Sequence, residues 1–170
     1  MTGAVNSSNC HSPFSPSLVE LRGGGQLIKN VDHIAITVTD LDRSVEFYTK
    51  ALGMKEVLRW KSKIPGIREI AFVKTEGGML ELLAVDKPKK ARPDDIAEAG
   101  VKHLCFGVTE IEMEIERLKK MKVPVIQDFH VLNEEHLETK SGTMKLDLKK
   151  GLKRIVFADP DGIPIELLQA

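Results

Sequence analysis

The 170-residue sequence has few cysteines, few aromatic residues and no net charge. Its two cysteines, Cys10 and Cys105, lie in a polar N-terminal segment and in an apolar run, which argues against a disulfide framework. The aromatic residues are six Phe, one Trp and one Tyr, too few for a surface that stacks bases. The 25 basic and 25 acidic side chains form no basic stripe, so we expect no nucleic-acid partner.

Long apolar runs are also missing from the sequence. No run approaches the ~20 residues that a membrane-spanning helix needs, so we expect no membrane partner. Residues 1–17 contain no Lys or Arg and no apolar stretch typical of a signal peptide. We therefore expect a cytoplasmic protein, whose 42% hydrophobic and 29% charged residues are typical of globular domains.

The N-terminal residues differ in composition from the remainder of the chain. Residues 1–25 are rich in Ser, Asn, Pro and Gly, and they end in three consecutive glycines. Such a composition buries too little apolar surface to offset the entropy of ordering. We expect a flexible tail at 1–25 and a single domain at 26–170.

The domain is organised around a segment that occurs twice. Residues 31–39 (VDHIAITVT) and 101–109 (VKHLCFGVT) are short apolar runs, each with one histidine at the same place. Alternation along a strand puts His33 and His103 on faces that otherwise carry small residues. The opposite face of each segment is bulky and is expected to pack on a helix.

The elements that follow these segments also repeat. A helix is expected at 41–52, capped by Asp40 and ended by Gly53, and a second helix begins near residue 110. The remaining expected strands cover residues 54–61, 68–74, 79–85, 125–132, 152–158 and 163–169. We predict an α+β fold of two βαβββ modules, at 28–86 and 101–169, joined by a linker at 87–100.

Four residues occupy the same two places in each module: His33, Glu81, His103 and Glu166. Each glutamate lies on the last strand of its module between apolar neighbours, where a carboxylate is costly unless it is paired or binds a cation. Two imidazoles and two carboxylates suit Zn²⁺, Ni²⁺, Mn²⁺, Co²⁺ or Fe²⁺. The alternative is hydrogen-bonded core histidines with solvated glutamates. The second module is longer at 127–151, which is expected to flank the site.

Two stretches resemble glyoxalase I and its vicinal-oxygen-chelate relatives: DLDRSVEFYTKALGMKEVLR at 40–59 and DPDGIPIEL at 159–167. The resemblance covers residues 28–169. It implies paired modules whose curved mixed sheets surround one divalent metal. The family's four metal-ligand positions fall on His33, Glu81, His103 and Glu166.

The resemblance further implies an enzyme that transfers a proton next to a metal-chelated oxygen of a small-molecule substrate, as lactoylglutathione lyase does. It implies a homodimer, and it assigns Glu166 as a metal ligand that can also act as the base. Glu69 is the second candidate for the base. Glyoxalase I typically has an arginine and an asparagine for glutathione where this sequence has Thr37 and Val85.

Other members of the family give alternative functions. Methylmalonyl-CoA epimerase also begins with a VDHI-type strand and has a catalytic glutamate at the place of Glu69. It usually has glutamine at the place of Glu81, however, and it lacks the DPDG turn. Drug-binding relatives keep the fold without the ligands. An extradiol dioxygenase needs Fe²⁺ held by two histidines and one carboxylate, and the fourth candidate ligand argues against that reading.

Overall fold

The computed structural model describes residues 29–89, 99–132 and 151–169. The chain divides into two units, Met1–Asn30 and Val31–Ala170, and the fold below belongs to the second unit. The expected tail at 1–25, most of the linker at 87–100 and residues 133–150 of the longer segment lie outside the described residues. None of the helices in the described part of the chain could span a membrane.

The first module forms a four-stranded mixed sheet with a helix. Its elements are β1 (Ile34–Val38), α1 (Leu41–Glu46), a π-helical turn η1 (Phe47–Ala51), β2 (Lys55–Lys61), β3 (Ile67–Lys74) and β4 (Met79–Val85). The strand order is β1-β4-β3-β2. β1 runs parallel to β4, and the other neighbours are antiparallel. This is the strand–helix–three-strand unit that the sequence predicts.

The expected helix at 41–52 is divided into α1 and the π-helical turn. Its start is as predicted, because the side chain of Asp40 accepts the backbone N–H of Arg43 at 3.0 Å. Within it, the hydroxyl of Thr49 donates to the carbonyl of Val45 at 2.7 Å. A hydroxyl that competes for this carbonyl bends a helix. Gly53, at φ +67°, lies just beyond the end of the helix, as expected.

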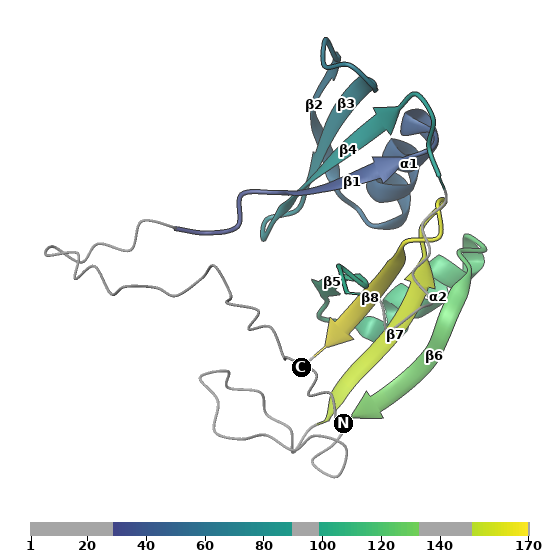
Figure 1. Cartoon of the computed structure of the whole chain (residues 1–170). Helices are drawn as coiled ribbons and strands as arrows, with labels where there is room; N and C mark the ends of the chain where they lie inside the picture. Colours follow the sequence, from purple (N-terminus) through teal and green to yellow (C-terminus); the bar gives the residue numbers. More distant parts are fainter. Residues whose placement is uncertain (1–28, 90–98, 133–150, 170) are drawn as a thin grey trace, which may run out of the picture. The chain divides into compact units, whose positions relative to one another are not determined.

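The second module repeats the topology of the first. Its elements are β5 (Leu104–Gly107), α2 (Ile111–Lys120), β6 (Val125–Leu132), β7 (Leu152–Ala158) and β8 (Pro164–Gln169). The strand order is β5-β8-β7-β6, with β5 parallel to β8 (Figure 1). The predicted α+β fold of two repeated modules is confirmed.

Both candidate histidines lie just outside the strands that were expected to contain them. β1 and β5 each begin at the residue after the histidine, His33 or His103. Pairing of β5 with β8 begins at Leu104 and Ile165. The residue before Ile165 is Pro164, which has no N–H to donate to a neighbouring strand. Each histidine therefore directly precedes the first residue of its strand, where a side chain has more room than inside a sheet.

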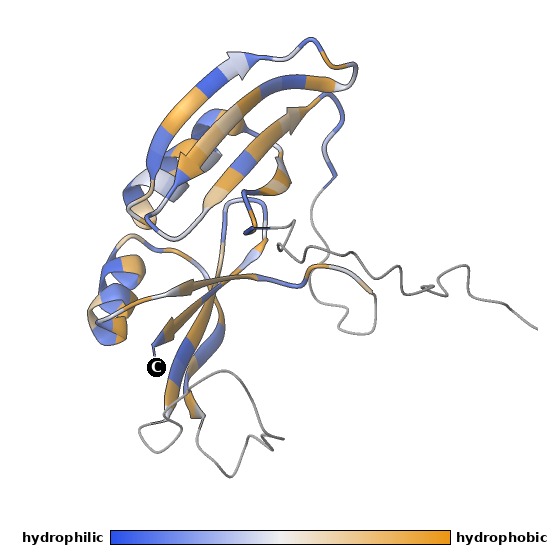
Figure 2. Cartoon of the chain, turned by 90° about the vertical axis from the view of Figure 1, so that its left-hand side faces the viewer, coloured by the Kyte–Doolittle hydropathy of each residue, from blue (hydrophilic) through white to orange (hydrophobic). Residues whose placement is uncertain are grey.

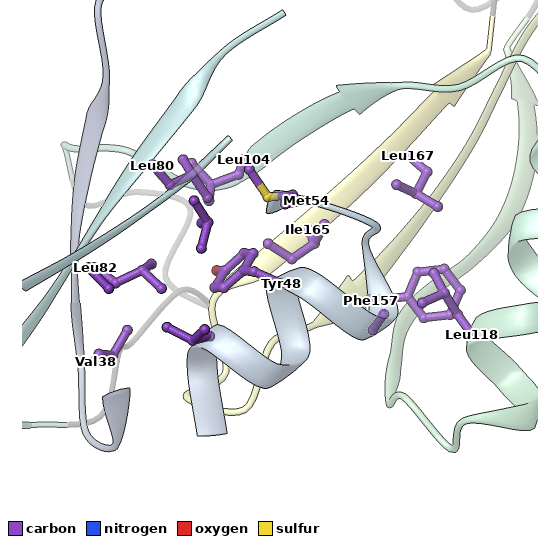
Figure 3. Packing of buried hydrophobic residues seen from close by; sticks show 14 of the residues in the cluster. Val38, Tyr48, Met54, Leu80, Leu82, Leu104, Leu118, Phe157, Ile165 and Leu167 are labelled. Atoms are coloured by element: carbon purple, nitrogen blue, oxygen red, sulfur yellow. The ribbon is translucent and has the colours of Figure 1, made fainter. Parts of the chain in front are cut away.

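The hydrophobic core collects the apolar faces of the strands and helices. Hydrophobic and hydrophilic residues alternate along several strands, as expected for sheets with one buried face (Figure 2). The buried cluster includes Val38, Tyr48, Met54, Leu80, Leu82, Leu104, Leu118, Phe157, Ile165 and Leu167 (Figure 3). These residues come from both modules, so one core supports both sheets.

The turn between β7 and β8 carries a buried carboxylate that binds the first module. Asp159 is 3% exposed and accepts the hydroxyl of Tyr48 at 3.0 Å. It also accepts the backbone N–H groups of Asp161 at 2.8 Å and Ile163 at 2.7 Å. Burial raises the pKa of Asp159, although these hydrogen bonds act in the opposite direction. The same carboxylate therefore shapes the DPDG turn and ties it to the first module.

Asp161, the second acid of this turn, binds the start of the first helix. Its carboxylate accepts the backbone N–H of Thr39 at 3.0 Å, and also the hydroxyl of Thr39. Arg43 Nη2 donates to Asp161 Oδ1 at 2.8 Å. The DPDG turn therefore connects the two modules, directly before the strand that carries Glu166.

Replacing Tyr48 with phenylalanine should lower the free energy of unfolding by about 1–3 kcal/mol, because Asp159 Oδ2 loses its donor in a buried setting. Denaturant unfolding measures the change, and a double-mutant cycle with Asp159→Asn isolates the contribution of the pair. Equal unfolding free energies for wild type and Y48F would contradict the contact.

The loss in Y48F should also depend on pH. Burial and the charge of Asp159 raise the pKa of Tyr48 above its ordinary value of 10.0. The phenol thus keeps its proton in the folded state but releases it in the unfolded state above about pH 10. The advantage of wild type over Y48F should be complete below that pH and shrink above it. Because Tyr48 is the single tyrosine, phenolate absorbance should rise together with unfolding.

Candidate functional site

His33 and Glu81 meet on one face of the first sheet. β1 pairs in parallel with β4 and places Ala35 opposite Glu81, so the small residues of β1 share a face with this carboxylate. His33 Nε2 lies 3.4 Å from Glu81 Oε2. The His33 side chain is 37% exposed and that of Glu81 is 18% exposed, so the imidazole is the more accessible member of the pair.

Asp32 fixes the other side of the His33 ring. Asp32 Oδ1 lies 2.8 Å from His33 Nδ1. This hydrogen bond raises the pKa of His33, and the negative charge of Glu81 acts in the same direction. If Nδ1 carries a proton for Asp32, the neutral ring has its lone pair on Nε2, on the side of Glu81. A carboxylate behind a histidine in this way is the usual support of a metal-ligating imidazole.

An aromatic run continues from His33 across the same sheet. The ring of Phe72 on β3 meets His33 edge to face, with centroids 5.3 Å apart. Trp60 on β2 stacks on Phe72, with centroids 5.7 Å apart and an angle of 15° between the planes. Trp60 is 39% exposed. The first half of the candidate site is thus flanked by an apolar, partly accessible wall.

His103 and Glu166 form the corresponding pair in the second module. Cys105 on β5 is opposite Glu166 on β8, which repeats the relation of Ala35 to Glu81. His103 Nε2 lies 3.0 Å from Glu166 Oε2. Glu166 is 8% exposed as a residue, and its other oxygen, Oε1, accepts Arg154 Nε at 2.8 Å. Burial and the charge of Glu166 raise the pKa of Cys105, so its thiol is held protonated.

The donor distances in both pairs are those of a His–Glu ion pair, and they are also compatible with two ligands of one divalent metal. Two donors bound to one ion at ~2.1 Å lie about 3.0–3.4 Å apart at angles between 90° and the tetrahedral value. The nitrogen-to-oxygen distances are 3.4 Å in the first pair and 3.0 Å in the second. Nitrogen and carboxylate ligands suit the ions that the sequence suggests.

The structure brings the four predicted ligands together in twos. Within residues 29–89, 99–132 and 151–169, no three His, Cys, Asp or Glu side chains form a group able to hold a metal ion. The two imidazoles do line the same pocket, which has a volume of about 1030 Å³. Leu52, Met54 and Phe106 are among its other lining residues. Small-molecule sites in proteins are commonly pockets of this size with mostly apolar walls.

Comparison with known proteins identifies the family. Residues 30–167 match the family described as the Glyoxalase/Bleomycin resistance protein/Dioxygenase superfamily. The chain belongs to this superfamily. The match includes both modules and both His–Glu pairs.

Two proteins are similar to this superfamily member in sequence, and one solved structure is similar to it in fold. A probable lactoylglutathione lyase of Synechocystis sp. is 31% identical over 145 residues, which cover 81% of this chain and 92% of the relative. The mitochondrial methylmalonyl-CoA epimerase of Mus musculus is 26% identical over 145 residues, 82% of this chain and 72% of the relative. The crystal structure of SMU.1112c has a TM-score of 0.64 at 24% identity, covering 83% of this chain and 98% of that one.

Glu69, the second candidate base, is not brought to either pair in this glyoxalase-superfamily chain. It is opposite Ala84 on β4, whereas Phe72 is opposite Glu81, so Glu69 and Glu81 lie on different faces of the sheet. Arg59 binds both oxygens of Glu69, at 2.9 and 3.3 Å. This contact lowers the pKa of Glu69. The arrangement is an ion pair on the helix side, where Arg59 also binds Asp42 at 2.6 Å.

Two residues that the sequence pattern does not single out, Asp32 and Arg154, contact the predicted ligands of this superfamily member. Asp32 adjoins His33 in the chain, and an acid directly before a candidate ligand could have drawn attention. Arg154 is a charged residue within the largely apolar strand β7, on the same face as Val156, which is opposite Glu166. A charged residue at this place in the strand is unusual and can be recognised in the sequence. Its contact with Glu166 cannot, because it depends on the pairing of β7 with β8.

Proposed function

We propose that this protein is a metal-dependent lyase or isomerase that moves a proton beside a substrate carbonyl, with lactoylglutathione lyase-like chemistry as the leading activity. The main support is the repeated His–Glu pair, with donor distances of 3.4 and 3.0 Å in the two modules. We infer one divalent ion, Zn²⁺, Ni²⁺, Co²⁺, Mn²⁺ or Fe²⁺. The residues proposed to hold it are His33, Glu81, His103 and Glu166.

Such an ion, when bound, would act as a Lewis acid that makes the proton next to a substrate carbonyl easier to remove. Glu166 is the proposed base, because its Oε2 faces His103 while the residue is 8% exposed and thus largely screened from bulk water. It would accept the proton at Oε2 and return it to the neighbouring carbon. Glu69 is disfavoured for this role by its place on the other face and its ion pair with Arg59.

We further propose that the two pairs complete one site, either within a single chain or across the two protomers of a dimer, since the described residues of one chain bring no three candidate ligands together. Both imidazoles line one pocket of the same chain, whereas Glu81 and Glu166 are not among its lining residues. A homodimer and a cytoplasmic location remain predictions from the sequence.

The epimerase is the second candidate, because the mouse relative carries that name at 26% identity. Two features favour the lyase over it. Glu81 is a carboxylate where the epimerase usually has glutamine, and Glu69, which the epimerase resemblance makes the base, faces away from the paired histidine. Glyoxalase I typically contacts glutathione through residues at the places of Thr37 and Val85. Because neither residue matches, the proposal does not name the thiol that the substrate carries.

A solvent-exchange experiment tests the proposal. The protein, loaded with Ni²⁺ or Zn²⁺, is offered a glutathione hemithioacetal and, separately, methylmalonyl-CoA in D₂O, and deuterium in the product is measured by mass spectrometry. We expect exchange with the hemithioacetal, lost after treatment with a chelator and restored by metal. Exchange with methylmalonyl-CoA alone would select the epimerase. If neither substrate exchanged at any metal loading, the proposed enzyme activity would be wrong and a binding role for small molecules would be the better explanation.

A further inference from the structure

The two modules share their topology but surround their carboxylates differently. In the second sheet, a line of polar contacts crosses the strands in their spatial order. Arg154 on β7 donates through Nη2 to Gln127 Oε1 on β6 at 3.1 Å, and through Nε to Glu166 Oε1 on β8 at 2.8 Å. Glu166 Oε2 then lies 3.0 Å from His103 Nε2.

The first module has an apolar residue at the place of Arg154. Phe72 is opposite Glu81 as Val156 is opposite Glu166, and two residues before them the sheets have Ile70 and Arg154. Ile70 is 3% exposed and cannot bind a carboxylate. The arginine is therefore a feature of the second half of the site, and the repeat itself does not require it.

The contact restricts how the Glu166 carboxylate can turn. The last torsion of a glutamate is broad, so an untethered carboxylate rotates and exchanges its two oxygens. The rigid planar guanidinium of Arg154 is fixed at two points, by Gln127 and Glu166, and its side chain is 23% exposed. A guanidinium braced in this way selects one orientation of the carboxylate.

We propose that Arg154 is a positioning residue, which holds Glu166 Oε1 so that Oε2 is the oxygen presented beside His103. This inference rests on the proposed function, in which Glu166 is both ligand and base. Gln127 completes the arrangement by fixing the far side of the guanidinium. Loss of Arg154 should therefore weaken metal binding even though it removes a positive charge near a cation site.

Calorimetric titration of the metal-free, full-length protein with Ni²⁺ tests this role. Arg154→Met should weaken Ni²⁺ binding by roughly 10–100-fold, the range for residues that orient a metal ligand. Arg154→Lys, which keeps the charge and one donor, should recover part of that loss. Lys153→Met is the matched control, because it also removes one positive charge from β7. Lys153 directly precedes Arg154 and binds Glu112 on helix α2 at 2.5 Å. It should leave Ni²⁺ affinity unchanged.

The sign of the effect separates positioning from charge. If Arg154 acted only as a nearby cation, R154M would bind Ni²⁺ more tightly, and unchanged or tighter binding would overturn the positioning role. Failure of the wild type to bind Ni²⁺ would instead overturn the proposed metal site, and the positioning role with it. Thermal unfolding of each variant shows whether it is folded, and if R154M is not, weaker binding by folded R154K supports the proposal and wild-type binding overturns it.

Discussion

Turnover by the Glu166→Gln variant should fall roughly 10²–10⁴-fold, the contribution typical of a positioned acid–base group. Glutamine keeps the size of the side chain and an oxygen that can accept Arg154 Nε, which now lies 2.8 Å from the carboxylate. It loses the ability to take up a proton, and its single oxygen cannot serve both Arg154 and the proposed metal, so turnover is compared at a metal concentration that calorimetric titration shows to saturate the variant. The measurement is the rate of deuterium entry into product with whichever of the two substrates exchanges in the wild type.

Glu112→Gln provides the control for this variant. Glu112 lies on helix α2 in the same module and binds Lys153 at its surface, so the substitution removes one carboxylate outside the candidate site. Its turnover should equal that of the wild type. Wild-type turnover in E166Q would exclude Glu166 as the base, and a loss of similar size in E112Q would show that the assay responds to charge or stability.

Metal binding should be nearly abolished in His103→Ala. This side chain lies 3.0 Å from Glu166 and lines the pocket that also contains His33. Replacing a direct ligand removes at least as much affinity as replacing its supporting residues, so we expect a loss of at least ~100-fold in calorimetric titration with Ni²⁺ or Zn²⁺. Lys153→Met is again the control, since Lys153 binds Glu112 on helix α2, outside the candidate site.

Unchanged affinity in H103A would remove the second pair from the proposed site. A mixture of the H103A and H33A variants then tests whether the two pairs of one site come from the same chain or from two protomers. If all four ligands come from one chain, the mixture should bind no better than either variant. Recovery of one strong site per mixed dimer, which is about one for every four chains after random exchange of protomers, would show that each site takes one pair from each protomer.

The sequence by itself determined the repeat and most of the element boundaries. The strands expected at 79–85, 125–132 and 152–158 are β4, β6 and β7 without change. Period-two alternation and the cap at Asp40 are local properties of the chain, which is why they can be read without a structure. The same alternation put His33 on the side of Ala35, and in the sheet Glu81 of β4 lies on that side too.

The tertiary structure decided which side chains meet. Alternation determines which residues of a strand share a face. Register determines which residues of the neighbouring strand lie on that face, and a register shift by one residue moves every side chain of the strand to the other face. Register put Glu69 behind the sheet with Arg59 and brought Arg154 to Glu166. The bond between Tyr48 and Asp159 joins residues 111 positions apart in the chain. The sequence could name candidate ligands, because their residue types are local, but their partners depend on contacts that only the folded chain creates.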